Sequence, residues 1–193
     1  MKILYIGSFN PITLGHIEII NYVLKTFKDS KITIVPSSDL YEKESLDTFF
    51  NDRFNMIRIA LRNYQNVTFS NIEEELSKRL LRNPKTIETL LALKEFDTLL
   101  IGSDNYLNLD SWYKIDELLS NYKVMVYPRN KFDKSTLKIY EKYRDSFIFL
   151  DDAKFLEISS TEVREDLNQN KDTSKILDDE VLKYIKEHHL YEK

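Results

Sequence analysis

The sequence predicts a doubly wound α/β fold, in which a mostly parallel, Rossmann-like sheet carries helices on both faces. Short apolar, β-branched runs recur along the chain, and most are followed by stretches whose apolar residues repeat with the helical period. Polar turns that contain glycine follow the first and fourth runs, where such sheets bind ligands. The length of 193 residues suits a single domain, 1–193, with enough chain to bury a substantial core.

Six apolar runs are expected to form the strands of this sheet. They are residues 1–6, 31–35, 66–69, 98–101, 124–127 and 146–150. Pro36 and Pro128 follow the second and fifth runs and stop them, because proline cannot donate to the ladder of a sheet.

Helices are expected where apolar residues recur at helical spacing. This spacing predicts helices from Gly15 onward and over 53–61, 86–95 and 178–191. Thr86 is expected to cap its helix by accepting from the N–H of Thr89. Residues 72–82 could form a solvated helix or an ordered loop, 137–143 are a further candidate helix, and 37–51 are predicted to be a loop over the site. Arg53 could be a solvated charge or a phosphate ligand.

Composition excludes several classes of protein. The net charge of −4 and the acidic balance argue against a nucleic-acid-binding surface, and the absence of cysteine excludes disulfides and thiolate metal sites. No apolar run approaches the length of a membrane span, and the amino terminus reads as a strand rather than a signal peptide. A cytoplasmic protein without membrane or nucleic-acid partners is therefore expected, and a homo-oligomer is left open.

Two turns have the features of anion sites. Gly7-Ser8-Phe9-Asn10-Pro11 lies between the first strand and a helix, which points backbone N–H groups and the helix dipole at a phosphate. His16 at the start of that helix can donate to an anion. Near the carboxyl end, Ser159 and Glu162 have the spacing of a capping box, and Arg164 follows one turn into the helix.

A third candidate site follows the fourth strand. Gly102-Ser103-Asp104 stands at the edge of the sheet where doubly wound folds bind ligands. Trp112, the single tryptophan, follows in a polar context. It could be a core or lid residue, or it could stack on a heterocycle. No Asp/Glu cluster predicts a metal site built by the protein alone.

Several segments resemble one known family. Residues 7–16, Gly-Ser-Phe-Asn-Pro-Ile-Thr-Leu-Gly-His, resemble the first motif of the nucleotidyltransferase superfamily, His/Thr-x-Gly-His. Four further segments, in colinear order, resemble the nicotinate-nucleotide adenylyltransferase branch of that superfamily. They are 86–89, 101–112, 158–164 and 181–191.

Two positions depart from the pattern of this branch. Asn10 stands where aspartate is common, and Thr13 stands where the branch usually has histidine. Threonine at this position is typical of pantetheine-phosphate adenylyltransferase, an enzyme of coenzyme A biosynthesis, which is therefore one alternative function. A degenerate nucleotide-binding module without catalysis is a second alternative. The Arg-Gly-x-Arg turn expected in the pantetheine branch is absent, and the Trp112 segment favours the nicotinate branch.

The resemblance implies a reaction and a role for each matching residue. ATP and nicotinate mononucleotide would give nicotinate adenine dinucleotide and pyrophosphate, with Mg²⁺ carried by ATP. His16 would donate to the α-phosphate, with Thr13 as a weaker neighbour. ATP would be bound by Gly7, Ser8, Phe9, Gly15, His16, Gly102, Asp104, Ser159, Ser160 and Arg164. Thr86, Thr89 and Trp112 would face the nicotinate nucleotide, Trp112 by stacking.

Overall fold

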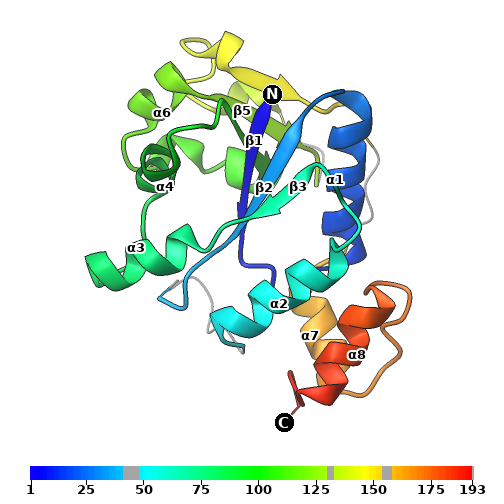
Figure 1. Ribbon diagram of the computed structural model, residues 1–193. Coiled ribbons are helices and arrows are strands. Elements are labelled where there is room, and N and C mark those ends of the chain that lie inside the picture. Colours follow the sequence, from blue (N-terminus) through cyan, green and yellow to red (C-terminus); the bar gives the residue numbers. More distant parts are fainter. Residues whose placement is uncertain (41–47, 130–132, 154–157, 193) are drawn as a thin grey trace.

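A six-stranded parallel sheet forms the centre of the protein (Figure 1). The computed structural model describes residues 1–40, 48–129, 133–153 and 158–192. All six predicted strands are confirmed, and every neighbouring pair is parallel. The strands are β1 (Lys2–Gly7), β2 (Lys31–Pro36), β3 (Val67–Phe69), β4 (Thr98–Gly102), β5 (Lys123–Tyr127) and β6 (Phe147–Phe149).

The strand order creates a crevice at the carboxyl edge of the sheet. The order is β3-β2-β1-β4-β5-β6, so the chain builds outward from β1 in one direction and then returns to the centre to build outward from β4 in the other. The connections after β1 and β4 therefore leave the sheet on opposite sides, which opens a space between them. Gly7 and Gly102 are the last residues of these two strands.

Helices cover both faces of the sheet and enclose two apolar clusters, as the predicted fold class requires. The first cluster holds Tyr5 of β1 and lies under four helices: α1 (Leu14–Thr26), α2 (Phe50–Ala60), α7 (Ser160–Asn168) and α8 (Asp179–Glu187). The second holds Leu4 and lies under α4 (Thr86–Leu93), α5 (Ser103–Tyr106) and α6 (Ile115–Asn121), with Ile72 of α3 (Ile72–Leu80) at its edge. Leu4 and Tyr5 separate because successive side chains of a strand point to opposite faces.

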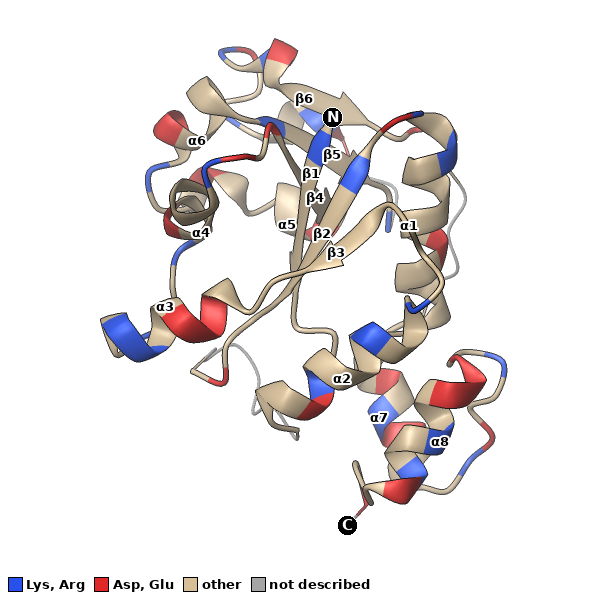
Figure 2. Cartoon of the chain, viewed as in Figure 1, with Lys and Arg blue, Asp and Glu red and all other residues tan. Residues whose placement is uncertain are grey.

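Charged residues gather on the helices and loops and leave the strands almost bare (Figure 2). The exceptions are Lys2, Lys31 and Lys123, each of which begins its strand. These lysines lie at the amino edge of the sheet, opposite the crevice. No helix within the described ranges is long and apolar enough to cross a bilayer.

Of the two readings left open for residues 72–82, the structure shows the helix, α3. Helix α2 begins at Phe50 rather than at residue 53. Helices α5 and α6 were not predicted, although Ile115, Leu118 and Leu119 of α6 have helical spacing and are buried. Of the predicted loop 37–51, residues 41–47 lie outside the described part of the chain.

The candidate helix over 137–143 is wrong, since this segment folds as consecutive turns between two short 3₁₀ helices. The Asp110 carboxylate accepts from the backbone N–H groups of Lys138 and Ile139, at 2.9 and 3.3 Å. These two N–H groups would have no partner inside a helix that began at residue 137, so the carboxylate fixes the start of the segment but does not itself prevent a helix.

The predicted caps are confirmed at one helix and corrected at another. Ser159 caps α7, so a helix starts where the sequence predicted one, but its hydroxyl accepts from the N–H of Thr161 rather than from that of Glu162, as the predicted capping box requires. In α4, however, the cap position belongs to Lys85, and Thr86 is the first helical residue. The Thr86 hydroxyl is therefore not needed to start the helix.

Candidate active site

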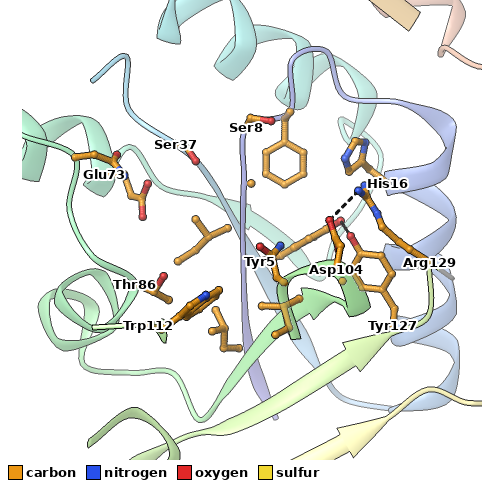
Figure 3. A pocket seen from close by; sticks show the side chains of 18 of the residues that line it. Tyr5, Ser8, His16, Ser37, Glu73, Thr86, Asp104, Trp112, Tyr127 and Arg129 are labelled. Carbon is orange, nitrogen blue, oxygen red and sulfur yellow. Dashed lines mark hydrogen bonds and ion pairs between the residues drawn. The ribbon is translucent and has the colours of Figure 1, made fainter. Parts of the chain in front are cut away.

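A cavity of about 390 Å³ opens at the carboxyl edge of the sheet, between β1 and β4 (Figure 3). It brings together the turns after β1, β2, β4 and β5 and the start of α4. It is lined by Tyr5, Ile6, Gly7, Ser8, Phe9, His16, Ser37, Glu73, Asn83, Pro84, Thr86, Leu99, Ile101, Gly102, Asp104, Asn105, Trp112, Tyr127 and Arg129. Seven of the residues expected from the sequence to bind ATP or the acceptor therefore share one cavity with His16.

His16 lines the cavity at the start of α1. Thr13 is the N-cap of this helix, and Thr13 and His16 occupy the two positions of a capping box. The Thr13 backbone N–H donates to His16 Nδ1 at 3.1 Å, and Thr13 Oγ1 lies 2.9 Å from the same nitrogen. Burial, together with the charge of Arg129, lowers the pKa of His16 to about 3. The imidazole is therefore neutral at physiological pH.

Asp104 and Arg129 form an ion pair at the same end of the cavity. Arg129 Nη1 lies 3.2 Å from Asp104 Oδ2, and the guanidinium carbon lies 6.0 Å from the centre of the Tyr127 ring. Gly102 makes this arrangement possible, because a Cβ atom there would come within 2.3 Å of an Asp104 oxygen. The glycine that ends β4 thus allows close approach of the Asp104 carboxylate to the strand end.

Two buried tyrosines form the floor between these groups. The hydroxyls of Tyr5 and Tyr127 are 3.2 Å apart, and burial raises the pKa of both phenols. Both therefore remain neutral. Phe9 packs edge-on against Tyr5 and lies 5.1 Å from the His16 ring, measured between ring centroids. This wall of rings limits the ways in which the His16 side chain can turn.

The other end of the cavity holds Trp112, Thr86 and a buried carboxyl group. Trp112 is partly buried against the second apolar cluster and also lines the cavity (Figure 3). Glu73 is only 3% exposed and accepts from the Thr89 hydroxyl at 2.9 Å. Burial raises the pKa of Glu73 to about 7. Trp112 and the start of α4 thus border the same end of the cavity.

Six residues that the sequence suggested for the site do not line the cavity. Thr13 and Thr89 are fully buried, and Thr89 is turned toward Glu73. The others are Gly15, Ser159, Ser160 and Arg164. Ser160 Oγ donates to the Pro11 carbonyl at 3.1 Å, and Arg164 Nη1 donates to the Asn10 carbonyl at 2.8 Å. The start of α7 therefore holds the first turn through two of its carbonyls.

Sequence reasoning missed several residues that line the cavity. Arg129 follows β5, and Ser37 follows β2, so both stand at the carboxyl edge where the strand ends meet. That rule could have identified them. Glu73 carried no such signal, because it is one of three consecutive glutamates at the start of α3. Only the structure distinguishes it from Glu74 and Glu75.

Arg53 is neither a solvated charge nor a residue of the cavity wall. Its side chain is fully buried in α2, and its guanidinium donates to the carbonyls of Ser8 and Ser37 at 2.8 and 2.7 Å. It also pairs with Asp39 at 3.1 Å. Arg53 therefore joins the turns that follow β1 and β2, and both of these turns line the cavity.

Comparisons with known sequences identify the family. A family model described as cytidylyltransferase-like matches residues 4–166. The Acholeplasma laidlawii protein named "Probable nicotinate-nucleotide adenylyltransferase" is 35% identical, over all of this chain and 98% of its own length. The protein of the same name from Caldicellulosiruptor bescii is 31% identical over the full length of both chains.

Solved structures show the same likeness. The nicotinic acid mononucleotide adenylyltransferase of Plasmodium falciparum, complexed with NaAD, superposes with a TM-score of 0.80 at 25% identity. The match covers 98% of this chain and 96% of that one. The same enzyme complexed with APC gives a TM-score of 0.78. Fold, motif order and full-length similarity agree, and the chain belongs to the nicotinate-nucleotide adenylyltransferase family within the cytidylyltransferase-like proteins.

Proposed function

We propose that this protein joins the AMP part of ATP to nicotinate mononucleotide, giving nicotinate adenine dinucleotide and pyrophosphate, a step of NAD biosynthesis. One observation carries the proposal: His16, a neutral hydrogen-bonding group at a helix start, shares a single cavity with Trp112, an aromatic side chain. The first suits a phosphate and the second suits a pyridine ring. Relatives named "Probable nicotinate-nucleotide adenylyltransferase" match the chain over its whole length.

The reaction needs positioning more than it needs a strong base. A phosphate oxygen of the mononucleotide attacks the α-phosphorus of ATP, and a new P–O bond forms. The bond between the α-phosphorus and the bridging oxygen breaks, and pyrophosphate leaves with that electron pair. Because the attacking phosphate is already an anion, the protein supplies orientation and donors for charge on the transferred group.

The residues divide between the two substrates. His16 would donate to the α-phosphate. Arg129 would give up its ion pair with Asp104 and bind phosphate oxygens instead, since a guanidinium group matches their geometry. Gly7, Ser8 and Phe9 would contribute the wall of the first turn. Gly102 and Asp104 would contact the adenosine ribose.

At the far end, Thr86 and Trp112 would hold the nicotinate nucleotide. Thr86 is the first residue of α4, where free backbone N–H groups favour an anionic group such as a carboxylate. Thr89 would contribute indirectly, through its hydrogen bond to Glu73.

The triphosphate would extend along the first turn toward Ser159, Ser160 and Arg164, which lie against that turn. We assign Mg²⁺ to the nucleotide. Over the described ranges, no group of three or more His, Cys, Asp or Glu side chains could hold a metal ion. Of the two carboxylates that line the cavity, Glu73 is buried and already accepts from Thr89. Carried on the triphosphate, the cation would neutralise phosphate charge.

Pyrophosphate release tests this function directly. The protein is mixed with ATP, Mg²⁺ and one acceptor at matched concentration: nicotinate mononucleotide, nicotinamide mononucleotide or phosphopantetheine. We expect the fastest release with nicotinate mononucleotide, and formation of the dinucleotide is checked by chromatography. Faster release with phosphopantetheine would assign the chain to the alternative that Thr13 suggests. ATP binding without pyrophosphate release in the presence of any of the three acceptors would identify a binding module.

A further inference from the structure

The contacts of His16 Nδ1 determine where the imidazole carries its proton. A backbone N–H can only donate, and the N–H of Thr13 points at Nδ1 from 3.1 Å. Nδ1 must therefore present its lone pair. A neutral imidazole has one N–H, which leaves it on Nε2. Thr13 Oγ1 lies 2.9 Å from His16 Nδ1, so the Thr13 hydroxyl is then also a donor to this nitrogen.

The surroundings of His16 oppose a second proton. An imidazolium would need an N–H on Nδ1, directed at the Thr13 N–H, and the side chain is only 9% exposed. The titratable groups that line the same cavity are Arg129, its partner Asp104, Tyr5, Tyr127 and Glu73. Arg129 is the charged group that acts on His16, and its positive charge disfavours an imidazolium.

We propose that Thr13 is a positioning residue that holds His16 as the neutral Nε2–H imidazole, so that His16 serves only as a hydrogen-bond donor to the transferred phosphate. The phosphate as the acceptor rests on the proposed function, whereas the tautomer rests on the contacts alone. Thr13 is fully buried and outside the cavity wall, so it acts through His16 and does not contact the substrate. No proton passes through the histidine during the reaction.

The tautomer is measurable without substrate. Long-range ¹H–¹⁵N correlation spectra of histidine-labelled protein distinguish the two nitrogens of each ring, and the spectrum of His16→Gln assigns the His16 signals among the three histidines. We expect an unprotonated Nδ1 and a protonated Nε2, unchanged from pH 5 to pH 8. A proton on Nδ1, or a titration of His16 within that range, would overturn the proposal. This result is independent of which acceptor the protein uses.

Two replacements of His16 separate a donor from an acid or base. Glutamine can place an amide N–H near the position of Nε2, whereas methionine has similar length and no donor. We expect His16→Gln to retain kcat within about tenfold of the wild type and His16→Met to lose about 10²-fold or more. The wild-type kcat should also be flat from pH 6 to pH 8. Equal losses in both variants, or a kcat that follows a histidine titration, would contradict a donor-only role.

Thr13 is tested by replacing its hydroxyl while keeping its shape. Thr13→Val keeps the backbone N–H that fixes the proton on Nε2 and loses only the hydroxyl donor. It should lower kcat by about tenfold and shift the ¹⁵N signal of His16 Nδ1, and Thr13→Ser should restore both. A purely structural role would lower the melting temperature of Thr13→Val and leave the ¹⁵N signals and kcat unchanged. That pattern would remove Thr13 from the proposed role.

Discussion

At the scale of single residues, Glu73 makes stability depend on pH. Its carboxyl group is buried, and its pKa is raised from 4.5 to about 7. Between these two values the unfolded chain loses a proton that the folded protein keeps. The free energy of unfolding therefore falls as pH rises through this window, because the unfolded state binds fewer protons than the native state.

Glu73→Gln should remove this dependence, because glutamine cannot ionise and its amide oxygen can still accept from Thr89. We expect the stability of Glu73→Gln relative to the wild type to increase by up to about 3 kcal/mol between pH 4.5 and pH 7. Urea denaturation at several pH values measures it. Glu75→Gln, an exposed position on the same helix, is the control and should show no such trend. A stability difference for Glu73→Gln that does not change with pH would show that Glu73 titrates normally.

Trp112 provides a second test at this scale. Trp112→Phe keeps an aromatic face and Trp112→Ala removes it. We therefore expect the Trp112→Phe variant to retain most of the wild-type affinity for nicotinate mononucleotide. Alanine should raise the acceptor KM by about tenfold, while ATP binding measured alone stays near that of the wild type. Titration calorimetry and initial rates give both numbers. Equal damage to both substrates, together with a large fall in melting temperature, would mean that Trp112 only packs the second apolar cluster.

At the scale of elements, several segments hold the first turn in place. Arg53 of α2 and Arg164 of α7 donate to carbonyls of this turn. Asn10 Oδ1 accepts from Tyr191 Oη at 2.7 Å and also from the Thr48 hydroxyl. The turn that carries the phosphate-binding groups is therefore shaped by residues from distant parts of the chain.

Tyr191→Phe tests whether the carboxyl-terminal segment contributes to catalysis through Asn10. Losing one hydrogen bond to the turn should lower kcat by about fivefold. Tyr184→Phe is the matched control, because the Tyr184 hydroxyl bonds Asp52 and Asn55 of α2 instead of the turn. We expect the control to lose a similar amount of stability and almost no activity. If the two variants have the same kcat, Tyr191 stabilises the fold without shaping the turn.

The elements that the sequence predicted are those whose signal is local. Each strand is a short apolar run, and α1 and α8 have clear apolar stripes, so periodicity sufficed. Residues 137–143 have comparable spacing but form consecutive turns, and the Asp110 carboxylate holds them through the N–H groups of Lys138 and Ile139. A tertiary contact of this kind leaves no trace in the local pattern.

In the candidate site, too, the residues with a local sequence signal were predicted and those placed by tertiary contacts were not. His16, Gly102, Asp104, Thr86 and Trp112 belong to recognisable segments, and the structure brings them into one cavity. For Arg53, the sequence shows only a positive charge and no sign that the side chain is buried. Its role depends on two carbonyls, Ser8 and Ser37, that approach each other only after β1 and β2 have paired.

At the scale of the whole molecule, the central pairing of the sheet joins residues far apart in the chain. Ile3 of β1 lies beside Ile32 of β2 on one side and beside Thr98 of β4 on the other. The cavity lies above this junction, and its walls come from both halves of the sheet. Neither half alone contains both His16 and Trp112.

This topology has a consequence for synthesis on the ribosome. β1 and β2 can pair early, but the other edge of β1 stays open until β4 has been made, roughly half the chain later. An apolar strand with unpaired N–H and C=O groups is a template for pairing with other chains, and nascent chains pass through such states. Completion of the central β1–β4 ladder therefore ends the interval in which this protein is most exposed to aggregation.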